Sequence, residues 1–266
     1  MSNRSTIQTP VTRVHSSGAV TTETDLIAAE EPLEIRVDGR PVAITMRTPG
    51  HDLELVAGFL FTEGVIDGPD DIHALAHVDD PSSPRGNTVD TVLAAGVPAG
   101  RRHNADRAMY ASSSCGVCGK QTLDRLMTIA PPLERHLDPA PELLTVLPGR
   151  LREEQAVFDQ TGGLHAAALF TPEGDLEVAR EDIGRHNAVD KVVGWRLLAD
   201  RVPVDDRILM VSGRVGFEIV QKALVARIPV VAAVGAPSSL AVQLANRAGM
   251  QLIGFLRDGR YNRYSD

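Results

Sequence analysis

The sequence has 266 residues, 43% of them apolar, and a formal net charge of −8. A chain of this length can bury one large core or two modest ones. Its acidic balance disfavours nucleic acid and anionic membranes as partners, although a local basic patch could still bind one phosphate. The sequence has no apolar run of about eighteen residues and no secretory signal pattern, so we expect a soluble, cytoplasmic protein.

Changes in composition divide the chain into three segments. Residues 1–24 are rich in Ser and Thr and have little apolar periodicity, which predicts a flexible tail. Residues 25–105 are expected to form a small N-terminal α+β domain, and residues 106–266 a larger α/β domain that carries both cysteines.

The small domain is predicted from a hairpin and a helix. Apolar residues alternate on both sides of Asp38 and Gly39, a pair typical of a tight hairpin turn. Asp52 is expected to cap a helix, because apolar residues recur after it at helical spacing until Gly64. A further strand is predicted near residues 88–94, and the apolar stripe of the helix must pack on this sheet.

In the larger domain, strands and helices alternate. Residues 165–170 and 176–181 are expected to pair as strands around a turn. After them, short apolar runs alternate with helical patterns, which predicts a layered α/β sheet with helices on both faces. The predicted helices lie near residues 121–129, 189–197, 217–226 and 239–248, and the later strands at residues 208–211, 229–234 and 251–256.

The two cysteines, Cys115 and Cys118, share the loop Ser112-Ser113-Ser114-Cys115-Gly116-Val117-Cys118-Gly119-Lys120. In a reducing compartment such a close pair is more often reactive or metal-bound than structural. The glycines and serines, a helix expected just after the loop and the charge of Lys120 all favour a thiolate. This loop is therefore the first candidate for nucleophilic chemistry.

Four other interpretations compete for the cysteine pair. A thioredoxin-like oxidoreductase carries its motif early in a βαβ unit, whereas about 110 residues precede it here. A structural zinc site would need two more ligands, such as His165, His186 or carboxylates. Zinc deaminases have a His-x-Glu and a Pro before the first cysteine, but this sequence has no His-x-Glu, and Ser114 precedes Cys115. Two buried, inert cysteines are disfavoured by the small neighbours of the pair.

Three polar loops follow predicted strands, at residues 181–187, 212–216 and 235–239. The carboxyl ends of strands are where α/β sheets bind ligands, and a loop before a helix suits an anion. None of the loops is a Walker loop. In the loop at residues 181–187, a capped helix start would account for about half of the polar residues, but it would not account for Arg185 beside His186. Together the loops indicate a phosphate-bearing ligand.

The C-terminal segment adds two arginines around a glycine. Arg257 and Arg260 follow the last predicted strand, with Gly259 between them. Arginine is well matched to phosphate and to the edge of a guanine base, although a solvated tail would explain the same residues.

Together these motifs resemble one family, the formate dehydrogenase accessory sulfurtransferases (FdhD family). The resemblance covers nearly the whole chain after the tail. It is carried by Glu54-Leu55-Val56-Ala57-Gly58-Phe59-Leu60-Phe61-Thr62-Glu63-Gly64, Cys115-Gly116-Val117-Cys118-Gly119, His165-Ala166-Ala167, Glu181-Asp182-Ile183-Gly184-Arg185-His186-Asn187-Ala188-Val189-Asp190-Lys191, Glu218-Ile219-Val220-Gln221-Lys222, Leu240-Ala241-Val242 and Gly254-Phe255.

The resemblance implies an enzyme, a sulfurtransferase with a cysteine persulfide intermediate. Cys115 would take sulfur from a pyridoxal-phosphate cysteine desulfurase and deliver it to the molybdenum or tungsten of a bis-molybdopterin guanine dinucleotide cofactor, which formate dehydrogenase needs in sulfurated form. Cys118 would assist or resolve the transfer. The residues implied to contact the cofactor are Phe255, Leu256, Arg257, Asp258, Gly259 and Arg260.

The resemblance also implies a cytidine-deaminase-like layered α/β domain without zinc chemistry, and a homodimer. No residue is assigned as a metal ligand. A second class stays open beside this one: a non-catalytic guanine-nucleotide or metal-binding module that uses Cys115 and Cys118 as ligands. Stoichiometric zinc in the purified protein would favour that alternative.

Overall fold

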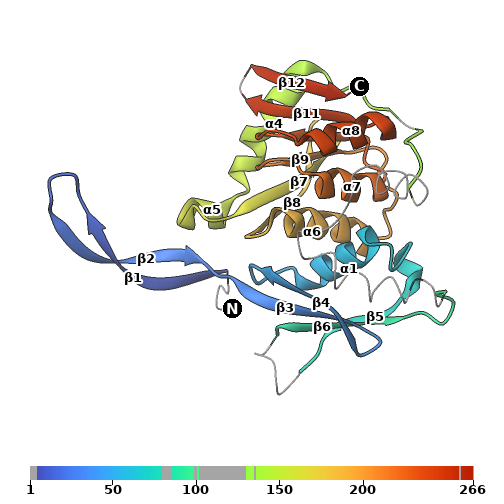
Figure 1. The fold of residues 1–266 in the computed structure, drawn as a ribbon, viewed down its shortest axis with the longest axis horizontal. Coiled ribbons are helices and arrows are strands. Elements are labelled where there is room, and N and C mark those ends of the chain that lie inside the picture. The colour runs from blue at the N-terminus through green and yellow to red at the C-terminus, as the bar shows by residue number, and fades with distance from the viewer. Residues whose placement is uncertain are drawn as a thin grey trace.

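A computed structural model of the protein describes residues 5–79, 86–98, 101, 130–134, 136–257 and 259–265. Within these residues the protein is a mixed α/β structure with three sheets (Figure 1). The first part contains β1 (Thr6–Val14), β2 (Val20–Ala28), β3 (Glu31–Val37), β4 (Arg40–Arg47), α1 (Asp52–Thr62), the short helix η1 (Pro69–Asp71), β5 (Ile72–His77) and β6 (Thr88–Leu93). The second contains α4 (Pro141–Glu153), α5 (Ala156–Thr161), β7 (His165–Phe170), β8 (Leu176–Asp182), α6 (Arg185–Leu198), β9 (Ile208–Val211), α7 (Phe217–Val225), β10 (Val230–Ala233), α8 (Ser239–Ala248), β11 (Gln251–Arg257) and β12 (Arg260–Ser265).

Strands β1 and β2 form an antiparallel ribbon that projects from the body of the molecule (Figure 1). Their pairing runs from Thr6 and Ala28 to Val14 and Val20, and no residue of either strand is buried. The predicted tail at residues 1–24 is therefore wrong where these strands run. Because both faces of the ribbon are exposed, its sequence lacks the apolar alternation of a half-buried strand, although Thr, Val and Ile favour strands.

The four-stranded sheet has the order β4-β3-β6-β5 and is covered by α1. It confirms the predicted hairpin and the predicted strand near residues 88–94. The helix is also confirmed, but its N-cap is His51 rather than Asp52. The Asp52 carboxylate instead receives hydrogen bonds from the buried guanidinium of Arg47, with both N–O distances at 3.0 Å.

The six-stranded sheet has the order β12-β11-β10-β9-β7-β8. Strands β9, β10 and β11 are parallel, while β7, β8 and β12 run antiparallel to their neighbours. The paired strands β7 and β8 and the later alternation of strands and helices are confirmed. Strand β12, α4 and α5 are additional elements that the sequence analysis does not predict.

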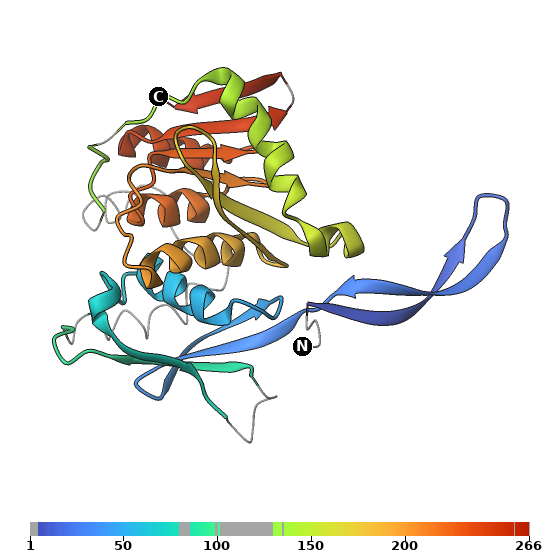
Figure 2. The same cartoon turned by 180° about the vertical axis from the view of Figure 1, so that it is seen from behind.

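Helices cover both faces of this sheet, as predicted, with α6, α7 and α8 on one side and α4 on the other (Figures 1 and 2). Strand β9 is fully buried, and its side chains point alternately to the two faces of the sheet, so it contributes to the core on each face. Leu209 and Val211 belong to the core under α6 to α8, whereas Ile208 and Met210 belong to the core under α4.

The two larger sheets are joined by the crossing of α1 and α6. The helices touch at two glycines: a Cβ added to Gly58 would lie 1.9 Å from the carbonyl oxygen of Asp190, and one added to Gly194 would lie 1.8 Å from that of Glu54. Only glycine permits such an approach of two backbones. The glycine-containing stretch after Glu54 is therefore needed for packing. The predicted domain boundary at residue 105 and the predicted helix near residues 121–129 lie outside the described residues.

Candidate functional site

The carboxyl edge of the six-stranded sheet gathers the polar loops noted in the sequence. Strands β9, β10 and β11 end at this edge because they are parallel. The antiparallel register brings His165, the first residue of β7, to the same edge, opposite Asp182 at the end of β8. The structure thus confirms that the loops at residues 212–216 and 235–239 lie side by side, joined by a bridge between Val215 and Pro237.

Glycines allow the loops at this edge to pack backbone against backbone. A Cβ added to Gly235 would lie 2.8 Å from the carbonyl oxygen of Gly213, and one added to Gly213 would lie 3.1 Å from Nδ1 of His165. The hydroxyl of Ser212 accepts a hydrogen bond from the amide of Ala166 at 2.9 Å, which ties the second loop to β7. The edge is therefore a preformed surface.

A pocket of about 750 Å³ opens at the carboxyl edge on the side of α4 and α5. Its volume is in the range of small-molecule and cofactor sites. Apolar side chains make up much of the wall, together with two arginines and a histidine. The lining residues are Pro148, Gly149, Leu151, Arg152, Gln155, Phe158, Gly162, Gly163, Leu164, His165, Ser212, Val234, Leu256 and Arg257.

Helix α5 is held against this pocket by Glu181. The Glu181 carboxylate accepts hydrogen bonds from the amides of Val157 and Phe158, at 2.9 Å and 2.8 Å. The guanidinium of Arg152 lies over the Phe158 ring, 4.5 Å from its centroid. The sequence does not predict the side of the pocket formed by α4 and α5. Helix α4 contains Pro148 and α5 has only six residues, so neither has a clear helical pattern.

His165 lies between that pocket and a group of charged side chains near the starts of α6 and α7, which includes Arg185, His186 and Arg214. Burial, followed by the charges of Arg185 and Arg214, lowers the pKa of His165 below its usual value. Burial and the charge of Arg185 likewise lower the pKa of His186 to about 4, against the opposing effect of Glu218. His186 is therefore neutral at pH 7, and the positive charge of this region belongs to the arginines.

The start of α6 is fixed by a buried ion pair. Asp182 and Lys191 lie 2.7 Å apart with side chains 0% and 1% exposed. Asp182 also accepts hydrogen bonds from the amides of Thr48 and Gly184 and from the side chain of Asn187. These contacts connect the four-stranded sheet to the carboxyl edge of the six-stranded sheet. They also fix the positions of Arg185 and His186 at the start of α6.

Most of the predicted cofactor-binding segment belongs to the end of β11, at Phe255, Leu256 and Arg257, and to the start of β12, at Arg260. Arg257 and Arg260 are paired across the two strands, and both are exposed. Phe255 has a left-handed backbone with φ of 52° and is 38% exposed, while Leu256 is buried. Of this segment, Leu256 and Arg257 line the pocket. Asp258 lies outside the described residues, as do Cys115 and Cys118, so the structure places neither cysteine.

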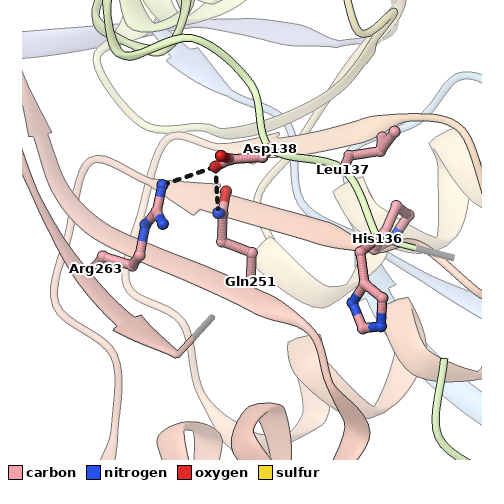
Figure 3. A pocket seen from close by; sticks show the side chains of 6 residues that line it. His136, Leu137, Asp138, Gln251 and Arg263 are labelled. Carbon is pink, nitrogen blue, oxygen red and sulfur yellow. Dashed lines mark hydrogen bonds and ion pairs between the residues drawn. The ribbon is translucent and has the colours of Figure 1, made fainter. Parts of the chain in front are cut away.

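A second pocket, of about 360 Å³, lies at the opposite edge of the sheet (Figure 3). Asp138 is bonded there to Arg263 at 3.0 Å and to the side-chain nitrogen of Gln251 at 3.4 Å. The charge of Arg263 is therefore neutralised by an ion pair, as is that of Arg152 in the first pocket, which pairs with Asp159. Arg257 makes no ion pair with the described residues. Within the described ranges, no group of three or more His, Cys, Asp or Glu could hold a metal ion, and no helix is long and apolar enough to cross a membrane.

The fold and the site define an α/β protein whose largest sheet has, at its carboxyl edge, a pocket and arginines that are unpaired among the described residues. Two relatives are each named "Sulfur carrier protein FdhD". The one from Streptomyces avermitilis is 51% identical over 258 residues, covering 93% of this chain and 90% of the relative. The one from Nocardia farcinica is 46% identical over 270 residues, covering 100% and 95%.

A solved structure from Desulfotalea psychrophila, described as a formate dehydrogenase accessory protein, is similar over most of its length. Its TM-score is 0.76 at 25% identity, with 98% of this chain and 97% of that chain covered. The model of the FdhD/NarQ family matches residues 28–266. The chain belongs to the FdhD/NarQ family.

Proposed function

We propose that this protein is a sulfurtransferase that carries sulfur on Cys115. The Cys115 thiolate attacks the outer sulfur of a persulfide on a cysteine desulfurase. The donor's sulfur–sulfur bond breaks, its cysteine leaves as a thiolate, and a new persulfide forms on Cys115. Cys118, three residues further on, assists or resolves the transfer.

The acceptor in this proposal is the molybdenum or tungsten of a bis-molybdopterin guanine dinucleotide, bound as cargo for formate dehydrogenase. The observation that carries the proposal is the cationic carboxyl edge in a protein of net charge −8. Its pocket combines apolar walls with Arg152, Arg257 and His165, a combination that suits a nucleotide with phosphates. In this proposal residues 255–260 contact the dinucleotide. The names of the relatives, a sulfur carrier protein and a formate dehydrogenase accessory protein, support the sulfur-carrying role and the link to formate dehydrogenase.

The proposal extends to fold kinship and assembly. The six-stranded sheet, with helices on both faces, is related to that of cytidine deaminases, but the chain has no His-x-Glu to activate a zinc-bound water. The protein acts in the cytoplasm as a homodimer that meets a desulfurase and formate dehydrogenase in turn.

Persulfide loading tests the proposal directly. The protein is incubated with a cysteine desulfurase and cysteine, and peptides are analysed by mass spectrometry without reductant. We expect one added sulfur on Cys115 in the wild type and in Cys118→Ala, and none on either cysteine in Cys115→Ala. Added sulfur on Cys118 beside an unmodified Cys115 would reverse the assigned roles. Stoichiometric zinc that survives dialysis, without sulfur loading, would instead support a metal-binding module.

A further inference from the structure

Two arginines on the α6 and α7 side of the carboxyl edge have no counter-ion among the described residues. Neither Arg185 nor Arg214 makes a hydrogen bond or ion pair there, and the buried Nε of Arg185 has no partner. Nε2 of the adjacent His186 is also buried without a hydrogen bond. In contrast, the nearby Arg180 binds Glu54 through two nitrogens. A buried polar nitrogen without a partner is costly, which points to a ligand that supplies one.

The carboxylates around these arginines do not neutralise them. Glu218, in the first turn of α7, is 59% exposed and lies 3.9 Å from Nε2 of His186, beyond hydrogen-bond distance. Asp182 is already paired with Lys191 at 2.7 Å. Neither carboxylate forms an ion pair with Arg185 or Arg214, of which Arg214 is exposed and Arg185 partly exposed.

Two helix starts add to this charge. Helices α6 and α7 begin after Gly184 and Gly216, and neither has a side-chain cap. Helix α8, the next along the edge, is capped by the hydroxyl of Ser238, which accepts a hydrogen bond from the amide of Ala241 at 3.2 Å. The first amides of α6 and α7 therefore lack the internal acceptor that α8 has, and free amides at a helix start favour an anion.

We propose that Arg185 and Arg214, with the starts of α6 and α7, form a subsite for a phosphate or diphosphate group. Neither arginine lines the pocket beside α4 and α5, but His165, whose pKa both arginine charges lower, does. The subsite therefore adjoins that pocket. The inference rests on the proposed function only for the source of the ligand, either the diphosphate of a guanine dinucleotide or a free phosphate compound. The planar guanidinium groups match phosphate oxygens and bind them through paired hydrogen bonds.

Calorimetric titration of the full chain at fixed low ionic strength tests the subsite, with inorganic pyrophosphate as the probe. Arg185→Gln and Arg214→Gln should each weaken pyrophosphate binding roughly ten- to hundredfold. Arg185→Lys keeps the positive charge but loses the planar guanidinium and its paired hydrogen bonds, so the loss of pyrophosphate affinity should be intermediate. Arg40→Gln, a matched change on the exposed start of β4, should leave the affinity within about twofold of wild type.

GDP identifies the source of the ligand. Competition between GDP and pyrophosphate, with both weakened by Arg185→Gln, supports the diphosphate of a nucleotide. Simultaneous binding, with pyrophosphate alone weakened by Arg185→Gln, supports a free phosphate compound. Both outcomes support the subsite.

Equal pyrophosphate affinity in wild type, Arg185→Gln and Arg214→Gln, or no binding by the wild type at millimolar concentration, would overturn the subsite. Sulfur loading of Cys115, measured on the same samples, keeps the two proposals apart. Normal loading without pyrophosphate binding refutes the subsite alone, whereas pyrophosphate binding without loading refutes the sulfur carrier alone.

Discussion

The junction between the two larger sheets and the carboxyl edge of the six-stranded sheet both contain many charges, but they differ in how these are paired. At the junction, each buried charge has an opposite partner. The pairs are Arg47–Asp52 at 3.0 Å, Lys191–Asp182 at 2.7 Å, Lys222–Asp190 at 3.0 Å and Arg180–Glu54 at 2.6 Å. At the carboxyl edge, Arg185 and Arg214 have no such partner within the described part of the chain.

One sequence motif, residues 181–191, contributes side chains to both the junction and the carboxyl edge. Residues 181–191 give Asp182 and Lys191 to the junction, where they are fully buried. The same stretch gives Arg185 and His186 to the open edge. Paired charges hold the two sheets together, whereas the charge of Arg185, three residues from Asp182, has no ion-pair partner among the described residues. A dense polar motif therefore need not serve a single purpose.

The largest loss of stability is expected at the crossing of α1 and α6, where the two backbones are in direct contact. In Gly194→Ala the new Cβ would meet the carbonyl oxygen of Glu54 at 1.8 Å, so α1 and α6 would have to separate. We expect a loss of about 5 kcal/mol or more in the free energy of unfolding, or no cooperatively folded protein. Denaturant unfolding measures it. Gly149→Ala in α4 is the control, because nothing lies within 4 Å of its added Cβ. It should be neutral or stabilise by up to about 1 kcal/mol. Similar stability of the two variants would contradict the close crossing.

Breaking the buried pair should be the next most damaging change. Lys191→Met leaves the Asp182 carboxylate buried without its counter-ion and removes hydrogen bonds to the carbonyl oxygens of Thr48 and Glu181. The expected cost is about 3–5 kcal/mol in the free energy of unfolding. A second variant with Asp182→Asn added should recover part of this loss, because the orphaned charge is gone. A full additive loss in the double variant would show that the two side chains do not interact.

The ion pair between Glu54 and Arg180 should make the junction sensitive to acid. Burial alone would raise the pKa of Glu54, but hydrogen bonds from Arg180 and His51 and their charges outweigh it and lower the pKa from 4.5 to about 2. A carboxyl group with a lowered pKa in the folded state stabilises it above the unfolded pKa. The stabilisation, about 3 kcal/mol, is therefore lost as the pH falls from 4.5 towards 2.

Chemical unfolding of the wild type and Glu54→Gln across this pH range measures the effect. The variant should be less stable than the wild type at pH 7 and lose less stability on acidification. Glu142→Gln, on the exposed start of α4, should keep the wild-type pH dependence. Parallel curves for wild type and Glu54→Gln would show that Glu54 has no lowered pKa.

Much of the fold could be predicted because its signals are local. The strand at Ile208–Val211 and the helix at Ser239–Ala248 follow from short apolar runs and helical spacing. The ribbon of β1 and β2 could not be found in this way, since neither face is buried. Strand β12 cannot be predicted from the sequence for a related reason. Its Arg, Tyr and Asn residues are mostly exposed, and only its pairing with β11 defines it as a strand.

The candidate site could be predicted only in part. The sequence indicated the anion-suited loops and the arginines at Arg257 and Arg260, because glycine-rich turns after strands are visible locally. It could not show that Phe158 and Arg152 form the opposite wall of the pocket, which depends on tertiary packing. Nor could it separate Lys191, which is neutralised by Asp182, from Arg185, which has no ion pair with the described residues, since pairing depends on the three-dimensional structure.

The smallest effect on stability is expected at the carboxyl edge, where the arginines have no ion pair with the described residues. Arg214→Gln removes an exposed charge that has no counter-ion in the described part of the chain, so the free energy of unfolding should change by less than about 0.5 kcal/mol. The same change should raise the pKa of His165 towards its usual value, because one of the two arginine charges that lower it is gone while burial remains. Imidazole titration by NMR measures this shift, with Arg40→Gln as the control.

Phosphate should then separate the two regions by binding linkage. A ligand that binds only the folded state stabilises it, so phosphate should stabilise the wild type against unfolding but stabilise Arg214→Gln much less. Arg40→Gln, which leaves Arg185 and Arg214 in place, should respond to phosphate like the wild type. A large loss of stability in Arg214→Gln without phosphate would place this arginine with the paired charges of the junction and end the distinction between the two regions.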